Sequence, residues 1–235
     1  MSTNCEFLNP LCVPSMLDKF HIRLAILDAL RLELGKLNGL VLDIGCGCMP
    51  YKPVVLAPPS CAESYIGLDL QDNIYQKPDL EWDGITIPLE DDSIDCALAT
   101  EVFEHCPDPE IVMREALRVL KPGGLLFFTV PFLWPLHDVP QDEHRYTPFA
   151  LERHLRNSGF GQIKLKALGG WDASLAQMIG LWVRRRPMSL RKRAIFSWLA
   201  LPIVRYLTTR DQPPQTFTES SMVTGIAGTA VKPKR

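Results

Sequence analysis

Residues 41–50, Val-Leu-Asp-Ile-Gly-Cys-Gly-Cys-Met-Pro, form an apolar run that breaks into two glycines one residue apart and ends at a proline. A parallel strand that ends in Gly-x-Gly brings its chain close to a ligand, because the first glycine permits a tight turn and the second lets backbone N–H groups approach. The third glycine of the dinucleotide fingerprint G-x-G-x-x-G is replaced by Pro50. A pyrophosphate also needs a helix N-terminus behind the turn, and residues 53–59 offer only a short, proline-interrupted one. The turn therefore predicts a ligand site and disfavours a nicotinamide dinucleotide.

The 235 residues, 46% of them apolar and 22% charged, suffice for one sizeable core. We expect a single domain over residues 1–235, with a core at 20–170, a helical insertion at about 172–210 and a last strand at about 222–231. The first twenty residues lack a basic start followed by an apolar run, so we expect neither a signal peptide nor a transit peptide. The predicted location is cytoplasmic.

The seven cysteines are odd in number and scattered, and no two of them form a C-x-x-C pair. This pattern argues against a disulfide framework and against a structural zinc site. Cys46 and Cys48 lie in the glycine turn but have no histidine or cysteine partner at ligand spacing. The sequence therefore predicts no metal site.

The net charge of −2 is unevenly distributed along the chain. Residues 184–193 carry six basic side chains and no acid, so subtracting these six from −2 leaves −8 on the remainder. A body this negative disfavours nucleic acid as a partner.

Short β-rich runs alternate with amphipathic helical segments along the chain. The expected strands are residues 40–44, 65–70, 94–99, 125–130 and 162–168, and the expected helices are residues 21–37, 109–120 and 147–157. Asp108 before Pro109 and Thr147 before Pro148 are predicted to begin two of these helices. Such alternation predicts a doubly wound, mostly parallel α/β sheet whose ligands lie beyond the carboxyl ends of its strands.

Three acids lie at or just past predicted strand ends: Asp43, Asp69 and Asp83. Asp69 stands 24 residues beyond Gly45, after the second strand, where both ribose hydroxyls of a nucleoside can donate to one carboxylate. Each acid also has a plainer interpretation, as a strand-end acceptor, a helix N-cap and a turn residue respectively. Their joint order favours a nucleoside site.

Residues 39–170 resemble the class I S-adenosylmethionine-dependent methyltransferases. The resemblance rests on five segments in order: 41–47 (VLDIGCG), 65–69 (YIGLD), 82–95 (WDGITIPLEDDSID), 101–105 (EVFEH) and 118–124 (RVLKPGG). It implies a Rossmann-like, seven-stranded sheet with helices on both faces and a helical insertion before the last strand. S-adenosylmethionine is the implied cofactor.

The resemblance also implies roles for residues along the cofactor. Gly45 and Gly47 would admit the methionine portion, while Asp43 would order the loop and its amino group. The remaining contacts would be Asp69 and Leu70 at the ribose, Asp83 and Gly84 at the adenine, and Thr100 and Glu101 on the sulfonium side. The family's frequent third glycine is Cys48 or Met49 here.

The segment 131–147 is too long, and too rich in histidine, acids and aromatic residues, to be a plain connector. We predict His137 as the general base for the acceptor. The predicted acceptor-binding side chains are Asp142, His144, Arg145 and Tyr146. The alternative is that residues 144–146 hold the loop to the following helix.

Residues 189–210 form a helical segment. The basic run of residues 184–193 stands immediately before its apolar residues. The residues predicted to share one face are Phe196, Leu199, Ala200, Ile203, Val204 and Leu207. The segment is too short to span a bilayer. Two interpretations stay open, a peripheral membrane contact suited to a lipid-linked acceptor, and a lid over the acceptor pocket or a dimer contact.

The first functional hypothesis is a methyltransferase that uses S-adenosylmethionine and a small-molecule acceptor, including a sugar or a lipid-linked intermediate. The second is a protein that binds S-adenosylmethionine without turnover. The third is a nicotinamide-dependent oxidoreductase. The sequence leaves the acceptor, the methylated atom and the oligomeric state open.

Overall fold

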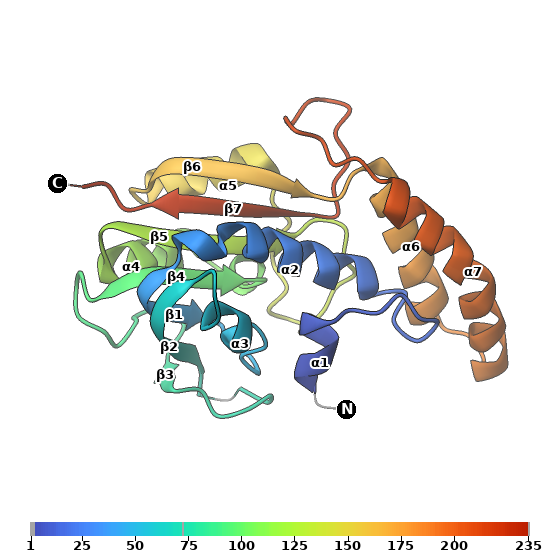
Figure 1. The fold of residues 1–235 in the computed structure, drawn as a ribbon, viewed down its shortest axis with the longest axis horizontal. Coiled ribbons are helices and arrows are strands. Elements are labelled where there is room, and N and C mark those ends of the chain that lie inside the picture. The colour runs from blue at the N-terminus through green and yellow to red at the C-terminus, as the bar shows by residue number, and fades with distance from the viewer. Residues whose placement is uncertain (1–2, 72, 235) are drawn as a thin grey trace.

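Seven strands form one sheet in a computed structural model that describes residues 3–71 and 73–234 (Figure 1). The strand order is β3-β2-β1-β4-β5-β7-β6, with β7 antiparallel to both of its neighbours and the other paired strands parallel. The strands are β1 (Asn38–Ile44), β2 (Cys61–Leu70), β3 (Leu80–Trp82), β4 (Ile94–Thr100), β5 (Leu120–Pro131), β6 (Gly161–Leu168) and β7 (Gly225–Val231). The predicted doubly wound, mostly parallel seven-stranded sheet is confirmed.

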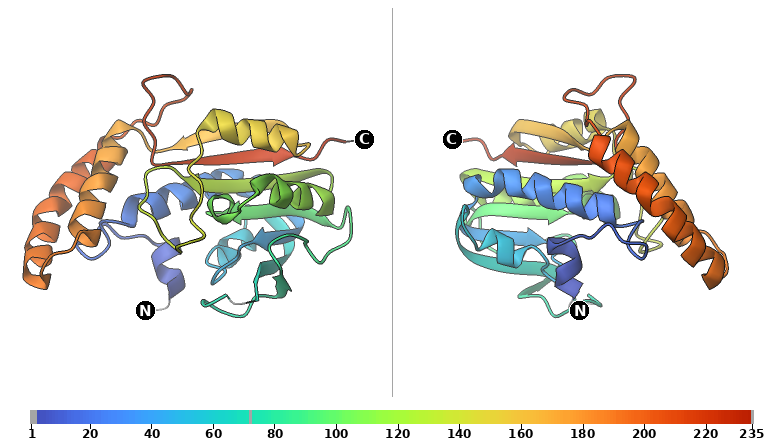
Figure 2. Two further views of the ribbon diagram at one scale, coloured as in Figure 1. Left: turned by 180° about the vertical axis from the view of Figure 1, so that it is seen from behind. Right: turned by 45° about the vertical axis from the view of Figure 1, so that its right-hand side comes forward.

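Helices cover both faces of this sheet. The α-helices are α1 (Thr3–Leu8), α2 (Phe20–Glu33), α3 (Lys52–Val55), α4 (Pro109–Val119), α5 (Pro148–Asn157), α6 (Trp171–Arg185) and α7 (Leu190–Arg210), and the 3-10 helices are η1 (Leu34–Lys36) and η2 (Phe103–His105). Helices α2 and α3 lie on one face, and α4 and α5 lie on the other, as the front and rear views show (Figures 1 and 2). The sheet is therefore the middle layer of three.

The core has two main parts, one on each face of the sheet. Leu42 and Ile44 of β1 pack with buried residues of α4 and α5, whereas Val41 packs with buried residues of α2. Successive strand side chains point to opposite faces, so a strand covered on both sides is apolar throughout. This requirement explains the apolar run that opens the glycine turn.

The predicted helix starts are confirmed. The Asp108 side chain accepts a hydrogen bond from Glu110 N (3.0 Å), and the Thr147 hydroxyl accepts one from Ala150 N (3.2 Å). Several strand limits differ from the expected ones: β2 and β5 begin earlier, and β7 begins at Gly225. Pairing with the neighbouring strand sets these limits: Leu120, the first residue of β5, pairs with Ile94 of β4.

Helices α6 and α7 form a hairpin that projects beyond one end of the sheet (Figures 1 and 2). The residues predicted to share an apolar face of α7 are only partly buried. Ala200 and Val204 are buried, Leu199 and Ile203 are 62% and 50% exposed, and Leu201, which lies off that face, is buried. The reason is that α7 packs on α6 and Leu17 through a narrow stripe, which leaves the apolar residues on either side uncovered.

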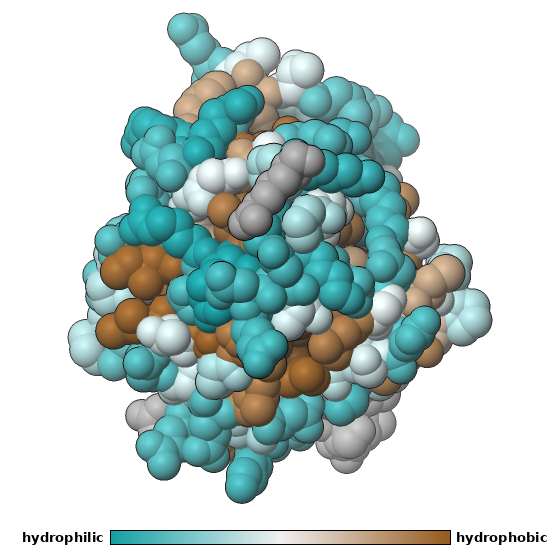
Figure 3. Space-filling model, turned by 90° about the vertical axis from the view of Figure 1, so that its left-hand side faces the viewer, coloured by the Kyte–Doolittle hydropathy of each residue, from teal (hydrophilic) through white to brown (hydrophobic). Residues whose placement is uncertain are grey.

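Among residues 3–71 and 73–234, we find no helix whose length and hydropathy would let it cross a bilayer. At the end where the parallel strands begin, the surface is largely hydrophilic, with separate hydrophobic patches (Figure 3). The ion pair between Lys121 and Asp95 (2.8 Å) lies at this end. The loops that carry the site described below lie at the opposite end.

Gly180 fixes where the hairpin joins the domain, and this contact can be tested. A Cβ added at Gly180 would lie 2.1 Å from Leu17 O, whereas one added at Gly35 meets nothing within 4 Å. We expect Gly180→Ala to cost about 1–3 kcal/mol through overpacking, which lowers the thermal midpoint by several degrees. Gly35→Ala is the matched control and should leave the midpoint unchanged or raise it. Equal midpoints for the two variants in a thermal melt would contradict this packing.

Candidate active site

The predicted cofactor residues and the acceptor loop lie at the carboxyl ends of the parallel strands. The glycine turn follows β1, Asp69 and Leu70 end β2, Asp83 follows β3, and Glu101 follows β4. The segment after β5 supplies the acceptor loop. This is the edge at which open α/β sheets bind their ligands.

The glycine turn combines tight packing on one side with open space on the other. Gly45 has φ of 65°, and a Cβ there would lie 2.7 Å from Cγ2 of Val102. Gly47 has φ of 52°, and a Cβ there would meet only Tyr75 within 4 Å, at 3.8 Å, among the described residues. Gly45 therefore permits the turn to pack on the segment after β4, and Gly47 is where a ligand can approach the main chain.

Met49 takes the left-handed conformation near the position where the related proteins often have glycine, with φ of 51°. Its side chain is buried against Gly67, where any Cβ would collide with the Met49 thioether. The turn thus keeps a left-handed step without a third glycine. The short helix α3 that follows, four residues long, matches the expected poor pyrophosphate site.

Asp43 is a buried carboxyl group with one unsatisfied oxygen. The Tyr65 hydroxyl donates to its Oδ2, while Oδ1 has no hydrogen-bond partner among the described residues. Burial raises the pKa of Asp43 to about 7, although the Tyr65 hydrogen bond acts in the opposite direction. An unpartnered buried carboxylate is costly, so Asp43 is suited to receive a cationic donor such as an ammonium group.

Asp69 ties the end of β2 to the glycine turn. Its Oδ2 accepts from Gly47 N (2.7 Å) and from the Asn73 side chain (2.9 Å), and its Oδ1 accepts from Leu70 N (2.8 Å). A carboxylate can accept about four hydrogen bonds, so acceptor capacity remains for a hydroxyl. The role of Asp69 at a ribose stays a prediction.

Asp83 lies in an exposed turn after β3, and its Oδ1 accepts from Ile85 N and Thr86 N, both at 2.8 Å. These backbone N–H groups, Thr86 first, lower the pKa of Asp83 and keep it an ionised acceptor. Beside it, a Cβ at Gly84 would lie 3.5 Å from Leu70, whose side chain is 43% exposed. Leu70 and Gly84 thus form a small apolar surface next to an acceptor, as an adenine ring requires; the contact itself stays a prediction.

Glu101 follows Thr100 at the end of β4 and takes a left-handed backbone conformation, with φ of 55°. Its N–H donates to Thr129 O of β5 (3.0 Å). Its Oε1 is buried without a hydrogen-bond partner in the described chain, and burial raises the pKa of Glu101 to about 7. Positive φ at a non-glycine residue is uncommon and occurs often at functional sites.

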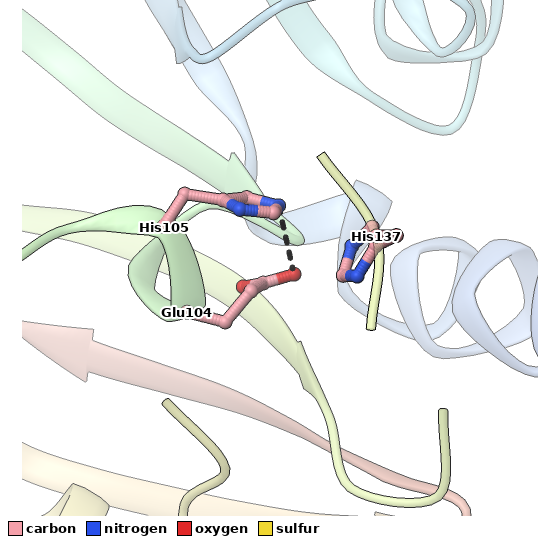
Figure 4. A group of neighbouring side chains, drawn as sticks. All are labelled: Glu104, His105 and His137. Atoms are coloured by element: carbon pink, nitrogen blue, oxygen red, sulfur yellow. Dashed lines mark ion pairs between the residues drawn. The ribbon is translucent and has the colours of Figure 1, made fainter. Parts of the chain in front are cut away.

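Glu104, His105 and His137 form a cluster beyond the end of β4, which we call the Glu-His-His cluster (Figure 4). Glu104 is fully buried, and neither of its carboxylate oxygens has a hydrogen-bond partner among the described residues. The Nε2 atom of His105 lies 3.7 Å from Oε1 of Glu104, and the two imidazole centroids are 4.7 Å apart. Burial, and then the nearby Glu101, raise the pKa of Glu104 well above its usual range.

Sequence reasoning predicted His137 but missed Glu104 and His105 as members of the site. A signal was present, because an acid and a histidine stand side by side just after the predicted fourth strand. The loop after the fifth strand carries His137, and β4 and β5 are neighbours in the sheet. Groups at the ends of adjacent parallel strands lie close together.

The other predicted residues of the acceptor loop bind one another. The buried Asp142 carboxylate receives both guanidinium nitrogens of Arg145, at 2.5 and 2.8 Å, and this pairing holds the pKa of Asp142 far below its usual range. The Tyr146 hydroxyl donates to Phe103 O (2.8 Å). Asp142, Arg145 and Tyr146 therefore hold the loop through one another and through η2, and a role for them in binding an acceptor stays a prediction.

His144 differs from these three residues. Its backbone N–H donates to Glu104 O (3.1 Å), but its buried Nε2 has no hydrogen-bond partner in the described chain. A role for His144 in binding an acceptor stays a prediction.

These groups fit S-adenosylmethionine at its amino-acid end. The unsatisfied Oδ1 of Asp43 lies near the end of β1 and the open main chain at Gly47 lies in the turn directly after that strand, so one ligand can use both. The cofactor's ammonium group would satisfy the Asp43 oxygen.

Comparisons with known proteins agree with this geometry. Residues 42–128, from within β1 to within β5, match the sequence model of a methyltransferase domain family. A 37.1 kDa protein in a transposon of Streptomyces fradiae is 31% identical over 151 residues, which cover 58% of this chain and 43% of that protein. A methyltransferase of Mycolicibacterium paratuberculosis is 31% identical over 136 residues, which cover 52% of this chain and 51% of that protein. The chain thus spans about half the length of these relatives.

Solved structures show the same fold. A Thermotoga maritima S-adenosylmethionine-dependent methyltransferase, described as a possible histamine N-methyltransferase, aligns with a TM-score of 0.57 at 16% identity and covers 92% of each chain. Together these comparisons show that residues 42–128 match a methyltransferase domain family and that the fold is the one seen in S-adenosylmethionine-dependent methyltransferases.

Proposed function

We propose that the chain transfers a methyl group from S-adenosylmethionine to an O–H or N–H group of a small-molecule acceptor. The observation that carries this proposal is the pairing of two sites at one edge of the sheet. The glycine turn with Asp43 offers a cofactor site, and the Glu-His-His cluster lies beyond the next strand, β4. Tyr75 lies beside the glycine turn, where its ring is 3.8 Å from the position of a Cβ on Gly47, and burial, then the charge of Asp138, raise the pKa of Tyr75.

Methyl transfer from a sulfonium is an in-line displacement. The methyl carbon forms a bond to the acceptor oxygen or nitrogen, and the carbon–sulfur bond breaks with its electron pair left on sulfur. The acceptor proton must leave, so the protein supplies orientation, exclusion of water and a path for that proton. His137, the predicted general base, belongs to the cluster that would face the acceptor.

Two alternatives from other functional classes remain distinguishable. A protein that binds S-adenosylmethionine without turnover would keep Asp43 and Asp69 and transfer no methyl group; the fold alone does not exclude it, because one fold hosts many activities. A nicotinamide oxidoreductase is disfavoured by Pro50 and by the four-residue helix α3.

Turnover tests the proposal directly. The full chain is incubated with methyl-labelled S-adenosylmethionine and separate panels of sugars, lipid-linked sugars, phenols and amines, with Asp69→Ala as the control. Labelled product with the native chain, lost in the control, supports methyl transfer. Cofactor binding without labelled product from any panel would favour the binding protein.

Asp43 gives a prediction with a definite pH dependence. Its pKa is about 7 in the folded chain and about 3.9 in an unfolded one, so ionisation opposes folding and its cost appears as the pH rises between these values. Asp43→Asn cannot ionise and should therefore melt higher than the native chain at pH 8, by a few degrees. The difference should shrink at pH 5, where Asp43 is mostly protonated in the folded chain.

The same variant should bind S-adenosylmethionine at least ~10-fold more weakly at pH 8, because the charge-assisted hydrogen bond is lost. Calorimetry measures the affinity, and differential scanning measures the midpoints. A midpoint difference that does not change with pH, or unchanged affinity, would contradict the role of Asp43.

The acceptor we favour is lipid-linked, because the α6–α7 hairpin carries features of a membrane-surface contact. Trp198, Leu199 and Ile203 are 67%, 62% and 50% exposed on α7. Leu199 and Ile203 line an apolar groove of about 460 Å³ between the two helices. Basic residues 191–193 open α7, so apolar and cationic groups lie on one projecting element.

Flotation with anionic liposomes tests this contact. We expect the native chain to float, and Leu199→Asp with Ile203→Asp to abolish flotation without unfolding the chain, since both side chains are at least half exposed. Leu32→Asp is the matched control, because Leu32 is 63% exposed on α2, outside the hairpin. Failure of the native chain to float would end the membrane proposal and favour a lid or a dimer contact.

A further inference from the structure

We propose that the Glu-His-His cluster binds a divalent transition-metal cation. Glu104 and His105 come from η2, directly after β4, and His137 comes from the loop after β5 (Figure 4). One ligand atom from each side chain lies within 4.8 Å of the other two. Two imidazoles and one carboxylate form a common first shell for divalent transition metals, and they leave further coordination positions open.

The distances allow a cation after small side-chain rotations. Ligand atoms about 2.1 Å from a tetrahedral centre are separated by about 3.4 Å. The His105 Nε2–Glu104 Oε1 separation is already 3.7 Å. The ligand atoms lie within 4.8 Å of one another, so closing the cluster shortens any of these separations by about 1.4 Å or less.

A contact outside the cluster orients the His105 imidazole. Nδ1 of His105 lies 3.3 Å from Gln141 O, which can accept its proton and leave Nε2, the nitrogen nearer Glu104, unprotonated and available as a ligand. Metal-bound histidines commonly have such a partner on the other ring nitrogen. Nδ1 of His137 lies 3.2 Å from Oδ2 of Asp142 but has no hydrogen-bond partner among the described residues, while the His137 backbone N–H donates to that oxygen (3.1 Å).

The buried Glu104 carboxylate is the strongest evidence that a cation binds at the Glu-His-His cluster. It is 0% exposed, and none of the described groups donates a hydrogen bond to it. Its charged or titratable neighbours include Glu101, Asp142, Arg145, Cys106, Tyr146 and the two histidines. Arg145 is paired with Asp142, so the local balance favours an added cation.

The ligand set also indicates which cations fit. Imidazole nitrogen suits zinc, copper, iron or nickel better than magnesium or calcium, which prefer oxygen ligands. We therefore expect Co²⁺ and Zn²⁺ to bind, and Mg²⁺ to bind much more weakly.

A cation at the Glu-His-His cluster would also hold the acceptor; this part of the inference rests on the proposed methyl transfer. An acceptor hydroxyl that takes an open position on the cation becomes more acidic, so its proton can leave to water as the oxygen attacks the methyl carbon. His137 would then be a ligand rather than the general base predicted from the sequence. The acceptor class would be one with a metal-binding oxygen, such as a phenol, a diol or a sugar hydroxyl.

The experiment is a Co²⁺ titration of the chelator-treated full chain, followed by visible absorption and by calorimetry. We expect one Co²⁺ per chain with the spectrum of nitrogen and oxygen ligands, and displacement by Zn²⁺. Glu104→Gln and His137→Gln should each weaken binding by at least ~10-fold. The matched control is Glu110→Gln, which removes the carboxylate of a surface ion pair with His154 (2.9 Å) and should leave Co²⁺ binding unchanged.

Several results would overturn the proposal. These are no Co²⁺ binding, equal losses in Glu104→Gln and Glu110→Gln, or a spectrum with thiolate charge-transfer bands, which would move the cation to cysteines such as Cys46 or Cys106. Circular dichroism checks that each variant folds. If His137→Gln does not fold, the conservative His137→Asn variant is titrated in its place. Because the titration uses neither cofactor nor acceptor, its outcome is independent of whether methyl transfer is found.

Discussion

The parallel pairing of β1 between β2 and β4 is the interaction on which the rest of the site depends. Asp43 pairs in register with Gly67 of β2 and with Leu98 of β4, so the three strands end at nearly the same level. The hydrogen bond from Gly47 N to Asp69 then joins the second strand to the glycine turn, and Gly45 packs on Val102 after the fourth. A shift of one residue in this register would move every ligand-binding group to the wrong level or the wrong face.

Buried carboxyl groups are the second physical feature of this edge. Asp43, Glu101 and Glu104 each hold at least one oxygen without a hydrogen-bond partner in the described chain. Such groups oppose folding when they ionise, and they are retained where a ligand or an ion satisfies them. Asp43 lies at the end of β1, and the two glutamates lie after β4. Two separate sites match a reaction that brings a cationic cofactor and an acceptor together.

The sequence predicted most of the fold, because strand and helix signals were local. The apolar run before Gly45, the N-caps at Asp108 and Thr147 and the glycines after α4 all act within a few residues. It did not predict which side of α7 is buried, since that depends on how α6 and Leu17 meet it. It also did not predict that Asp142 and Arg145 bind each other, because loop conformation joins side chains by tertiary contacts that leave no periodic pattern.

The cofactor residues were predicted in the same way, by their positions after successive strands, whereas the Glu-His-His cluster required the sheet order. Glu104 and His105 are 32 or more residues before His137 in the chain. They meet because β4 and β5 are adjacent and because Glu143 N and His144 N both donate to Glu104 O. Tyr65 and Asn73, which hold Asp43 and Asp69, were missed for a similar reason, since they act through side-chain hydrogen bonds across neighbouring segments.

The most direct test of the central claim is titration calorimetry of S-adenosylmethionine, S-adenosylhomocysteine and NAD into the full chain, with Asp69→Ala as the control. The account predicts binding of both sulfur ligands at micromolar concentration, loss of that binding in the variant and no binding of NAD. Binding of NAD alone, or of none of the three, would contradict the assignment of the glycine turn as a site for S-adenosylmethionine.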